Sequence, residues 1–366
     1  MKSFKILKAP DEALKEILLS LFELNKIKGV FALSRINSDN YGYALITDKT
    51  LIRDIAPTIP LMPANAAKSI SRLTMVESLK SPIAVVLRPC ELRALFELVK
   101  LEQARLDNMI FISFTCGGVF PTRIMKDGLH DKLEKYWENI KTGENLEDLR
   151  ESCRICEHFV PDNADIILNL VGENNISHET TVLLKSEKGE KLLTDKINKF
   201  VEIDLESEKL RSCINKRTEV KSKIYGAFET EKFGVDGLTR FFGRCINCHA
   251  CSKACPVCYC KLCFFESAEN EYNPSTLETM LNNRGALRLP VDTIFYHLGR
   301  LIHVGITCVG CGMCSDACPT DIPVSRIFSK AGERVQQLFE YVPGRNIDEK
   351  IPIATFQDTE LTEVEH

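Results

Sequence analysis

Residues 83–118 read IAVVLRPCELRALFELVKLEQARLDNMIFISFTCGG, and the fold of the N-terminal part depends on them. The two apolar runs Pro82–Leu87 and Asn108–Phe114 predict strands, and Glu91–Ala104 between them has the period of an amphipathic helix. A strand, a helix and a second strand at this spacing predict a βαβ unit with parallel strand pairing. We therefore expect an α/β domain here.

The same pattern continues on both sides of this unit. Residues 10 to 24 have the spacing of an amphipathic helix, and a later helix is predicted at Lys191–Phe200. Further strands are predicted at Gly29–Ser34, Tyr43–Thr47, Ala164–Val171 and Thr180–Leu184. We assign residues 1–204 to the α/β domain, 205–240 to a charged helical connector, 241–345 to a cysteine-rich domain with a helical insert, and 346–366 to a flexible tail.

The composition excludes several classes of function. The 366 residues carry a net charge of −4, so no electrostatic argument favours nucleic acid as a partner. No apolar run approaches the roughly 20 residues that a spanning helix needs, so no direct membrane insertion is expected. Sixteen cysteines, mostly at close spacing, favour metal ligation in a reducing, cytoplasmic compartment over a disulfide framework.

Two cysteine motifs form the internal repeat of the sequence. The first is Cys245-x2-Cys248-x2-Cys251-x3-Cys255-Pro, and the second is Cys308-x2-Cys311-x2-Cys314-x3-Cys318-Pro. In two-cluster ferredoxins, three cysteines at this spacing hold one 4Fe–4S cluster and the fourth holds the other cluster. We therefore predict one cluster on Cys245, Cys248, Cys251 and Cys318, and a second cluster on Cys308, Cys311, Cys314 and Cys255.

Zinc is the alternative metal for these motifs. A zinc site needs only four ligands from two separated knuckles, and two runs of four cysteines, each followed by proline, exceed that need. Cys258, Cys260 and Cys263 follow the first motif directly. They bind a further metal together with a partner's ligand, or they are unligated thiols beside a cluster.

Four cysteines in the N-terminal part are candidates for a third cluster. Cys90 precedes the predicted helix at Glu91, Cys116 follows the next strand, and Cys153 and Cys156 lie in a later loop. The carboxyl ends of neighbouring parallel strands share an edge, which is where open α/β sheets bind ligands. The spacing fits a 4Fe–4S cluster on these four thiols, and zinc or separate buried cysteines remain as alternatives.

The same residues carry a resemblance to a known family. The stretch Ile83–Gly118 and the stretch SCRICEHFVPDNADI (Ser152–Ile166) resemble the beta subunits of coenzyme F420-reducing hydrogenase and F420-dependent formate dehydrogenase. The two cysteine motifs and the YVPG segment (Tyr341–Gly344) are similar to the ferredoxin part of the formate dehydrogenase beta subunits. The resemblance covers most of residues 83–344.

This resemblance implies an α/β flavin domain that binds FAD, a cluster beside the flavin, and an α+β, two-cluster ferredoxin domain. We expect FAD contacts from Arg88, Gly117 and Gly118. The resemblance also implies cluster ligation by Cys90, Cys116, Cys153 and Cys156. FAD would exchange electron pairs with coenzyme F420 or another hydride carrier, and the clusters would pass single electrons to a catalytic subunit of a larger oxidoreductase.

Two departures from the family pattern support an alternative. The segment Asp11–Leu14 stands where relatives have a Glu-Cys-Gly-Gly-like stretch, and Leu168–Gly172 replaces their Gly-Asn-Trp-Gly-like stretch. The leading prediction is an iron–sulfur flavoprotein subunit that serves a formate dehydrogenase, hydrogenase or heterodisulfide-reductase-like partner. The alternative is an electron-relay subunit without hydride chemistry, like the cluster subunits of anaerobic sulfite reductase or sulfhydrogenase.

Overall fold

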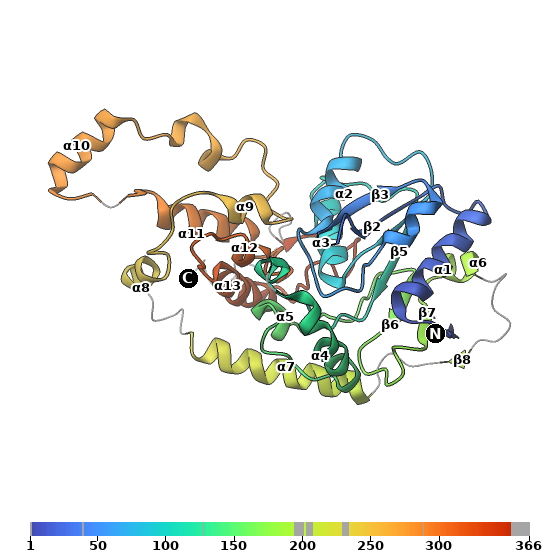
Figure 1. Cartoon of the computed structure of the whole chain (residues 1–366). Coiled ribbons are helices and arrows are strands. Elements are labelled where there is room, and N and C mark those ends of the chain that lie inside the picture. Colours follow the sequence, from blue (N-terminus) through green and yellow to red (C-terminus); the bar gives the residue numbers. More distant parts are fainter. Residues whose placement is uncertain are drawn as a thin grey trace, which may run out of the picture.

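The structure is a computed structural model that describes residues 2–38, 40–126, 128–193, 201–202, 208–228, 234–287 and 289–352. A mixed β-sheet forms one part of the molecule, and the helices α8 to α13 form the other (Figure 1). No helix within the described ranges is both long and apolar enough to cross a membrane.

The sheet has eight strands in the order β3-β2-β4-β5-β6-β7-β1-β8. Strands β2, β4, β5 and β6 are parallel, whereas β3, β7, β1 and β8 pair antiparallel with their neighbours. The strand bounds are β1 Lys2–Ile6, β2 Gly29–Arg35, β3 Tyr41–Ile46, β4 Ile83–Val86, β5 Met109–Phe114, β6 Ile166–Asn169, β7 Thr180–Leu184 and β8 Val201–Glu202.

Helices cover both faces of the sheet, and each face has its own apolar core. The core on one face includes Leu14 and Leu18 of α1, and the core on the other includes Leu92 and Leu95 of α3. The helices that accompany the sheet are α1 Pro10–Glu23, α2 Ala66–Thr74, α3 Pro89–Lys100, α4 Leu129–Thr142, α5 Glu151–Arg154 and α6 Glu187–Leu193, with 3-10 turns η1 Lys49–Asp54 and η2 Thr122–Lys126.

The predicted βαβ unit is confirmed. Strands β4 and β5 pair in parallel, with Ile83 opposite Met109, and α3 connects them. The other four predicted strands are present as β2, β3, β6 and β7, whereas β1 and β8 were not predicted. Helix α6 ends at Leu193, and the rest of the predicted helix Lys191–Phe200 lies outside the described residues.

The prediction of an α+β ferredoxin domain is wrong for the described residues after β8, which form helices and no strand. Their buried residues recur at helical spacing, as in α11, where Tyr296, Arg300 and Val304 are buried on one face. The elements are α7 Glu208–Gly226, α8 Gly234–Phe241, α9 Ala250–Ala254, α10 Pro274–Arg284, α11 Thr293–Val304, α12 Met313–Asp316 and α13 Val324–Leu338, with 3-10 turns η5 Phe264–Glu266 and η6 Ala268–Asn270.

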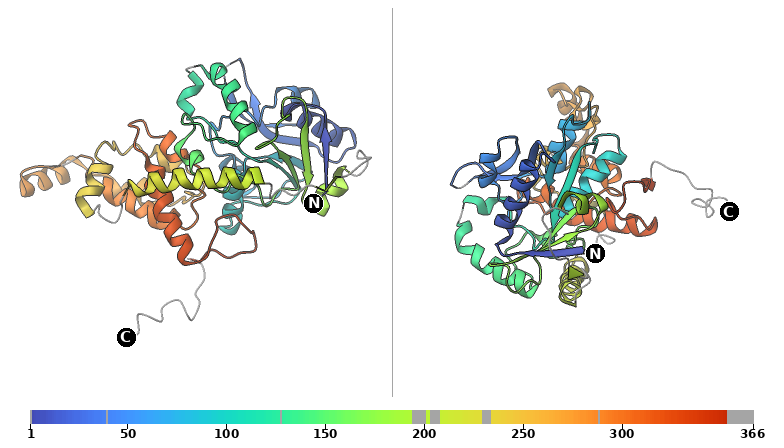
Figure 2. Two further views of the ribbon diagram at one scale, coloured as in Figure 1. Left: turned by 90° about the horizontal axis from the view of Figure 1, so that it is seen from below. Right: turned by 90° about the vertical axis from the view of Figure 1, so that its right-hand side faces the viewer.

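Helix α7 joins the two parts of the molecule and runs beneath both of them (Figure 2). Leu210 and Cys213 near its start pack in the core around α3. Toward its end, the Tyr225 hydroxyl donates to Ser329 Oγ of α13 at 3.0 Å, and Lys221 pairs with Glu333. Helix α7, within the predicted connector, therefore packs against both the sheet domain and α13.

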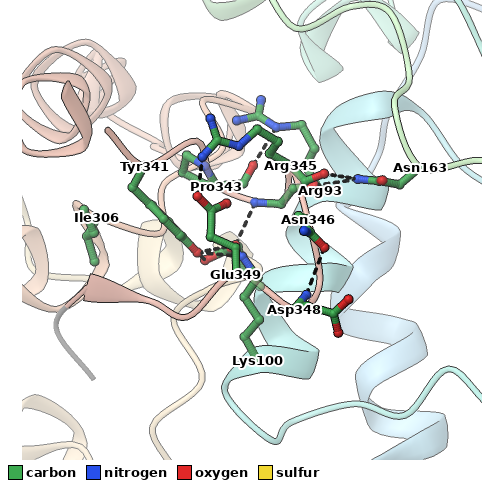
Figure 3. A network of polar contacts seen from close by, with 12 residues as sticks. Arg93, Lys100, Asn163, Ile306, Tyr341, Pro343, Arg345, Asn346, Asp348 and Glu349 are labelled. Atoms are coloured by element: carbon green, nitrogen blue, oxygen red, sulfur yellow. Dashed lines mark hydrogen bonds and ion pairs between the residues drawn. The ribbon is translucent and has the colours of Figure 1, made fainter. Parts of the chain in front are cut away.

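The segment after α13 returns to the sheet domain and docks on α3 (Figure 3). The Tyr341 hydroxyl donates to the buried Glu97 carboxylate at 2.7 Å, and the Gly344 amide donates to the same carboxylate at 2.7 Å. Arg93 Nε donates to the Pro343 carbonyl at 2.7 Å. The YVPG segment therefore ties the helical part to α3.

Candidate functional site

Two cysteines lie at the carboxyl edge of the parallel strands, as the βαβ pattern predicted. Cys90 is in the first turn of α3, directly after β4, and Cys116 follows β5. The Arg88 guanidinium joins these two loops, since its Nη1 lies 3.6 Å from Cys116 Sγ. The α3 start is fixed by Glu91, whose carboxylate accepts the Arg88 amide at 3.0 Å.

Cys153 and Cys156 come to the same place from α5 and the residue that follows its end. One cavity is lined by Cys90, Cys116, Cys153 and Cys156, which we name the inner set. Burial raises the pKa of the Cys153 thiol to about 11 and that of Cys90 well above its usual range. Thiolates bind iron, so a metal has to displace these protons when it binds.

The two cysteine motifs follow the same backbone path. The second and fourth residues after the first cysteine have positive φ in both loops: Asn247 and His249 in one, Gly310 and Gly312 in the other. A short helix then begins one residue later, α9 in the first motif and α12 in the second. The sequence repeat is therefore also a structural repeat.

Each motif gives its fourth cysteine to the neighbouring loop. A second cavity is lined by Cys245, Cys248, Cys251 and Cys318, which we name the outer set. Cys255 of the first motif lies beside Cys308, Cys311 and Cys314 of the second motif. Burial is the main cause that raises the pKa values of the Cys255, Cys308 and Cys314 thiols, and the neighbouring thiols raise them further. We name Cys255, Cys308, Cys311 and Cys314 the middle set.

The three sets follow one another through the molecule. Cys311 of the middle set lines the inner cavity, and it packs with Cys90 and Cys153 around one apolar cluster. The middle and outer sets meet at α9, where Cys251 and Cys255 are one helical turn apart. The order from the sheet outward is inner, middle, outer.

Hydrogen-bond donors around the outer set are consistent with a bound 4Fe–4S cluster, because the inorganic sulfides of such a cluster accept hydrogen bonds. The buried side chains of His297 and Arg300 leave His297 Nδ1 and Arg300 Nε without hydrogen-bond partners. The other nitrogens of these side chains approach cysteine sulfur: His297 Nε2 is 3.5 Å from Cys245 Sγ, and Arg300 Nη1 is 3.1 Å from Cys251 Sγ. Hydrogen bonds to sulfur are typical of iron–sulfur sites.

Among the residues that the structure describes, no three His, Cys, Asp or Glu side chains surround one point as the ligands of a single metal ion. A 4Fe–4S cluster requires a wider arrangement, because each of its four thiolates binds a different iron atom.

The three residues predicted to contact FAD, Arg88, Gly117 and Gly118, have close contacts within the protein, and their contact with a flavin stays a prediction. Arg88 Nη2 donates to the carbonyls of Pro57, Ile59 and Leu61. A Cβ on Gly117 would lie 2.6 Å from Ile140, and a Cβ on Gly118 would lie 3.1 Å from Cys153. These glycines permit close packing of α4 and α5.

The remaining cysteines differ in their surroundings. Cys258 is partly buried beside Arg300 and Cys255, Cys260 is exposed, and Cys263 packs near Phe265 and Tyr296. The isolated Cys213, on α7, is buried in the core around α3, as an inert thiol would be. None of the four lines the inner or the outer cavity.

The side chains that face the sulfur atoms, chiefly His297 and Arg300 on α11, were not predicted from the sequence. The helical period of α11 places His297, Arg300 and Val304 on its buried face with Tyr296. Arginine is rarely buried unless it is paired, so the helical period that places Arg300 on the buried face of α11 is the signal that could have identified it.

A family comparison matches residues 137–209 to the C-terminal region of the family "Coenzyme F420 hydrogenase/dehydrogenase, beta subunit". The chain is 28% identical to the F420-dependent formate dehydrogenase subunit beta of Methanocaldococcus jannaschii, over 91% of this chain and 90% of that protein. It is 29% identical to the F420-dependent formate dehydrogenase 1 subunit beta of Methanococcus maripaludis, over 74% and 75% of the two chains.

Among solved structures, the chain is similar to one from the F420-reducing [NiFe] hydrogenase complex of Methanosarcina barkeri. The TM-score is 0.44 at 11% sequence identity, and the match covers 64% of this chain and 93% of that chain.

Proposed function

We propose that this chain, which belongs to the beta subunits of the coenzyme F420 hydrogenases and dehydrogenases, relays electrons through three 4Fe–4S clusters inside a larger oxidoreductase. The observation that carries the proposal is the continuous order of the inner, middle and outer cysteine sets. Family and cysteine content together indicate iron–sulfur clusters, and the count of three is the proposal.

The inner set would hold its cluster with Cys90, Cys116, Cys153 and Cys156. The middle and outer sets would hold the two ferredoxin-type clusters, each with three cysteines of one motif and one of the other. Bound clusters supply one-electron carriers. The protein's own groups shield most of these thiols from water, although Cys248 is exposed, and donate hydrogen bonds to sulfur, as the Asn247 amide does to Cys245 Sγ at 3.4 Å.

The relay would connect a two-electron carrier on the side of the sheet domain with a catalytic partner on the side of the outer set. The relatives are named as F420-dependent formate dehydrogenase subunits, so we propose a catalytic subunit of that kind, or of a hydrogenase or heterodisulfide-reductase-like module, as the partner. The abundance of close-spaced thiols supports a reducing, cytoplasmic setting.

A flavoprotein with hydride chemistry is the second candidate, because a large cleft adjoins the inner and middle sets. Cys156 and Cys308 lie in its wall, together with Arg93, His158 and Tyr225. A planar carrier bound there would contact both cysteine sets. The contacts of Arg88, Gly117 and Gly118 do not support an FAD site at those three residues, so no step of the relay is assigned to a flavin.

Metal and flavin analysis of the anaerobically purified chain tests the proposal. Three clusters predict about twelve irons and about twelve acid-labile sulfides per chain. About eight irons would remove the inner cluster from the proposal, and zinc in place of iron would overturn it. Bound FAD that coenzyme F420 reduces would favour the second candidate, and full iron without flavin would favour the plain relay.

A further inference from the structure

Arg300 is a buried cation between two of the cysteine sets. It lies on α11, in the insert between the two cysteine motifs, and is 3% exposed. Its Nη1 donates to Cys251 Sγ at 3.1 Å and its Nη2 to the Cys251 carbonyl at 3.3 Å. Its Nε has no protein partner. The guanidinium is thus oriented by a cysteine of the outer set.

The charge of Arg300 has no carboxylate partner among the described residues. Burial lowers the pKa of Arg300, but the thiols of Cys251, Cys255 and Cys314 and the Tyr296 phenol outweigh it and raise the pKa. The ring of Phe328 lies 4.8 Å from the guanidinium carbon. An unpaired buried cation is strongly destabilising, so its counter-charge has to come from the sulfur atoms around it.

Cysteines of two sets contribute these sulfur atoms, and Cys258, which belongs to neither set, also contacts Arg300. Cys251 is in the outer set, whereas Cys255 and Cys314 are in the middle set. Other buried arginines near cysteines are bound differently: Arg150 pairs with Asp316, and Arg217 donates to the carbonyls of Cys116 and Cys156. Arg88 is 3.6 Å from Cys116 Sγ and donates to three carbonyls, whereas Arg300 lies 3.1 Å from a sulfur atom and has one carbonyl acceptor.

We infer that Arg300 sets the reduction potentials of the middle and outer clusters by placing one positive charge between them. The inference rests on the proposed function. Reducing a cluster adds one electron and one negative charge while every iron–sulfur bond remains, so a nearby fixed cation stabilises the reduced state. Arg300 therefore raises both reduction potentials and in this way influences electron transfer between the two clusters.

The test is a potentiometric titration of the full-length, cluster-loaded chain, followed by electron paramagnetic resonance. In Arg300→Gln, the potentials of the middle and outer clusters become more negative and that of the inner cluster stays unchanged. Arg300→Lys keeps the charge, so its potentials remain nearer to those of the unchanged chain. Arg326→Gln is the control, because Arg326 pairs with the Glu151 carboxylate and not with a cysteine sulfur, so all three potentials should stay unchanged.

Unchanged potentials in Arg300→Gln with a full complement of iron would overturn the inference, and so would an equal shift of all three clusters. If Arg300→Gln loses iron, an iron-loaded Arg300→Met chain serves as the uncharged variant in its place. If the potentials of Arg300→Lys then shift as much as those of Arg300→Met, the charge has no effect and the inference is overturned. Absence of iron from the unchanged chain would instead refute the proposed function.

Discussion

Arg150 and Asp316 form a buried ion pair that joins the sheet domain to the second cysteine motif. Arg150 Nη2 lies 2.5 Å from Asp316 Oδ2, and the two side chains are 3% and 6% exposed. Arg150 Nη1 also donates to the Cys311 carbonyl at 3.0 Å, and its Nη2 donates to the Met62 carbonyl at 3.3 Å. The Arg150 side chain therefore fixes the second cysteine motif, which carries Cys311, against the sheet domain.

We predict that Asp316→Asn destabilises the chain by about 3–5 kcal/mol, because it leaves the Arg150 charge buried and uncompensated. Denaturant unfolding under anaerobic conditions, followed by cluster absorbance and by circular dichroism, measures the change. Asp321→Asn is the control, since Arg123 and Asp321 connect the same two regions but are 73% and 72% exposed. That variant should unfold like the unchanged chain. Equal midpoints for the two variants would contradict the prediction.

Gly344 is predicted to be essential for docking of the YVPG segment. Its φ is +70°, and a Cβ there would overlap the backbone of Arg93 on α3. Gly344→Ala should therefore cost about 2–5 kcal/mol, from the left-handed backbone and the overlap together. Limited proteolysis after α13, together with unfolding midpoints, measures the loss of docking.

Gly285→Ala separates these two causes for Gly344. Gly285 has a nearly identical φ of +72°, but no atom lies within 4 Å of the position that a Cβ would take. This variant should cost only the backbone strain, about 1 kcal/mol. If Gly285→Ala destabilised the chain as much as Gly344→Ala, the packing of Gly344 on Arg93 would not matter.

Lys68 is predicted to protect the middle cluster. From α2, its Nζ donates to the carbonyls of Lys253 at 2.8 Å, Cys255 at 3.3 Å and Cys258 at 3.4 Å. Lys68→Met keeps the apolar stem but removes these bonds, so the loop that carries Cys255 opens more often and iron release to a chelator should become several-fold faster. Lys80→Met, at an 85% exposed side chain, should release iron at the unchanged rate.

The sheet and the cysteine sets illustrate what the sequence could predict. Strands β4 and β5 were predictable, because Ile83–Val86 and Met109–Phe114 are continuous apolar runs on either side of α3. Cys90 and Cys116 converge because parallel strands share a carboxyl edge. Strand β1 was missed, because KSFKI has one fully buried position and pairs with β7, nearly 180 residues away. A pairing that distant leaves no local signal.

The predicted flavin contacts illustrate what the sequence could not decide. Glycines after a strand are compatible both with a bound cofactor and with close packing, and only the positions of Ile140 and Cys153 identify packing at Gly117 and Gly118. Arg88 is similar, since its three carbonyl partners come from residues 57–61, far from it in the sequence. Local sequence could not distinguish these alternatives because the atoms that decide them are distant in the chain.

Cys311 is the cysteine through which the relay should be interrupted, since it belongs to the middle set and also lines the inner cavity. Cys311→Ser is predicted to reduce the iron content from about twelve to about eight per chain. Electrons would then enter the inner cluster but would no longer reach the partner, which rapid-mixing kinetics with spectra of each cluster would detect. Cys213→Ser is the matched control, because Cys213 is a buried thiol in neither cavity. If Cys311→Ser kept its full iron content and reduced the partner at the unchanged rate, Cys311 would not be a cluster ligand, because loss of a thiolate ligand has to alter the cluster it binds.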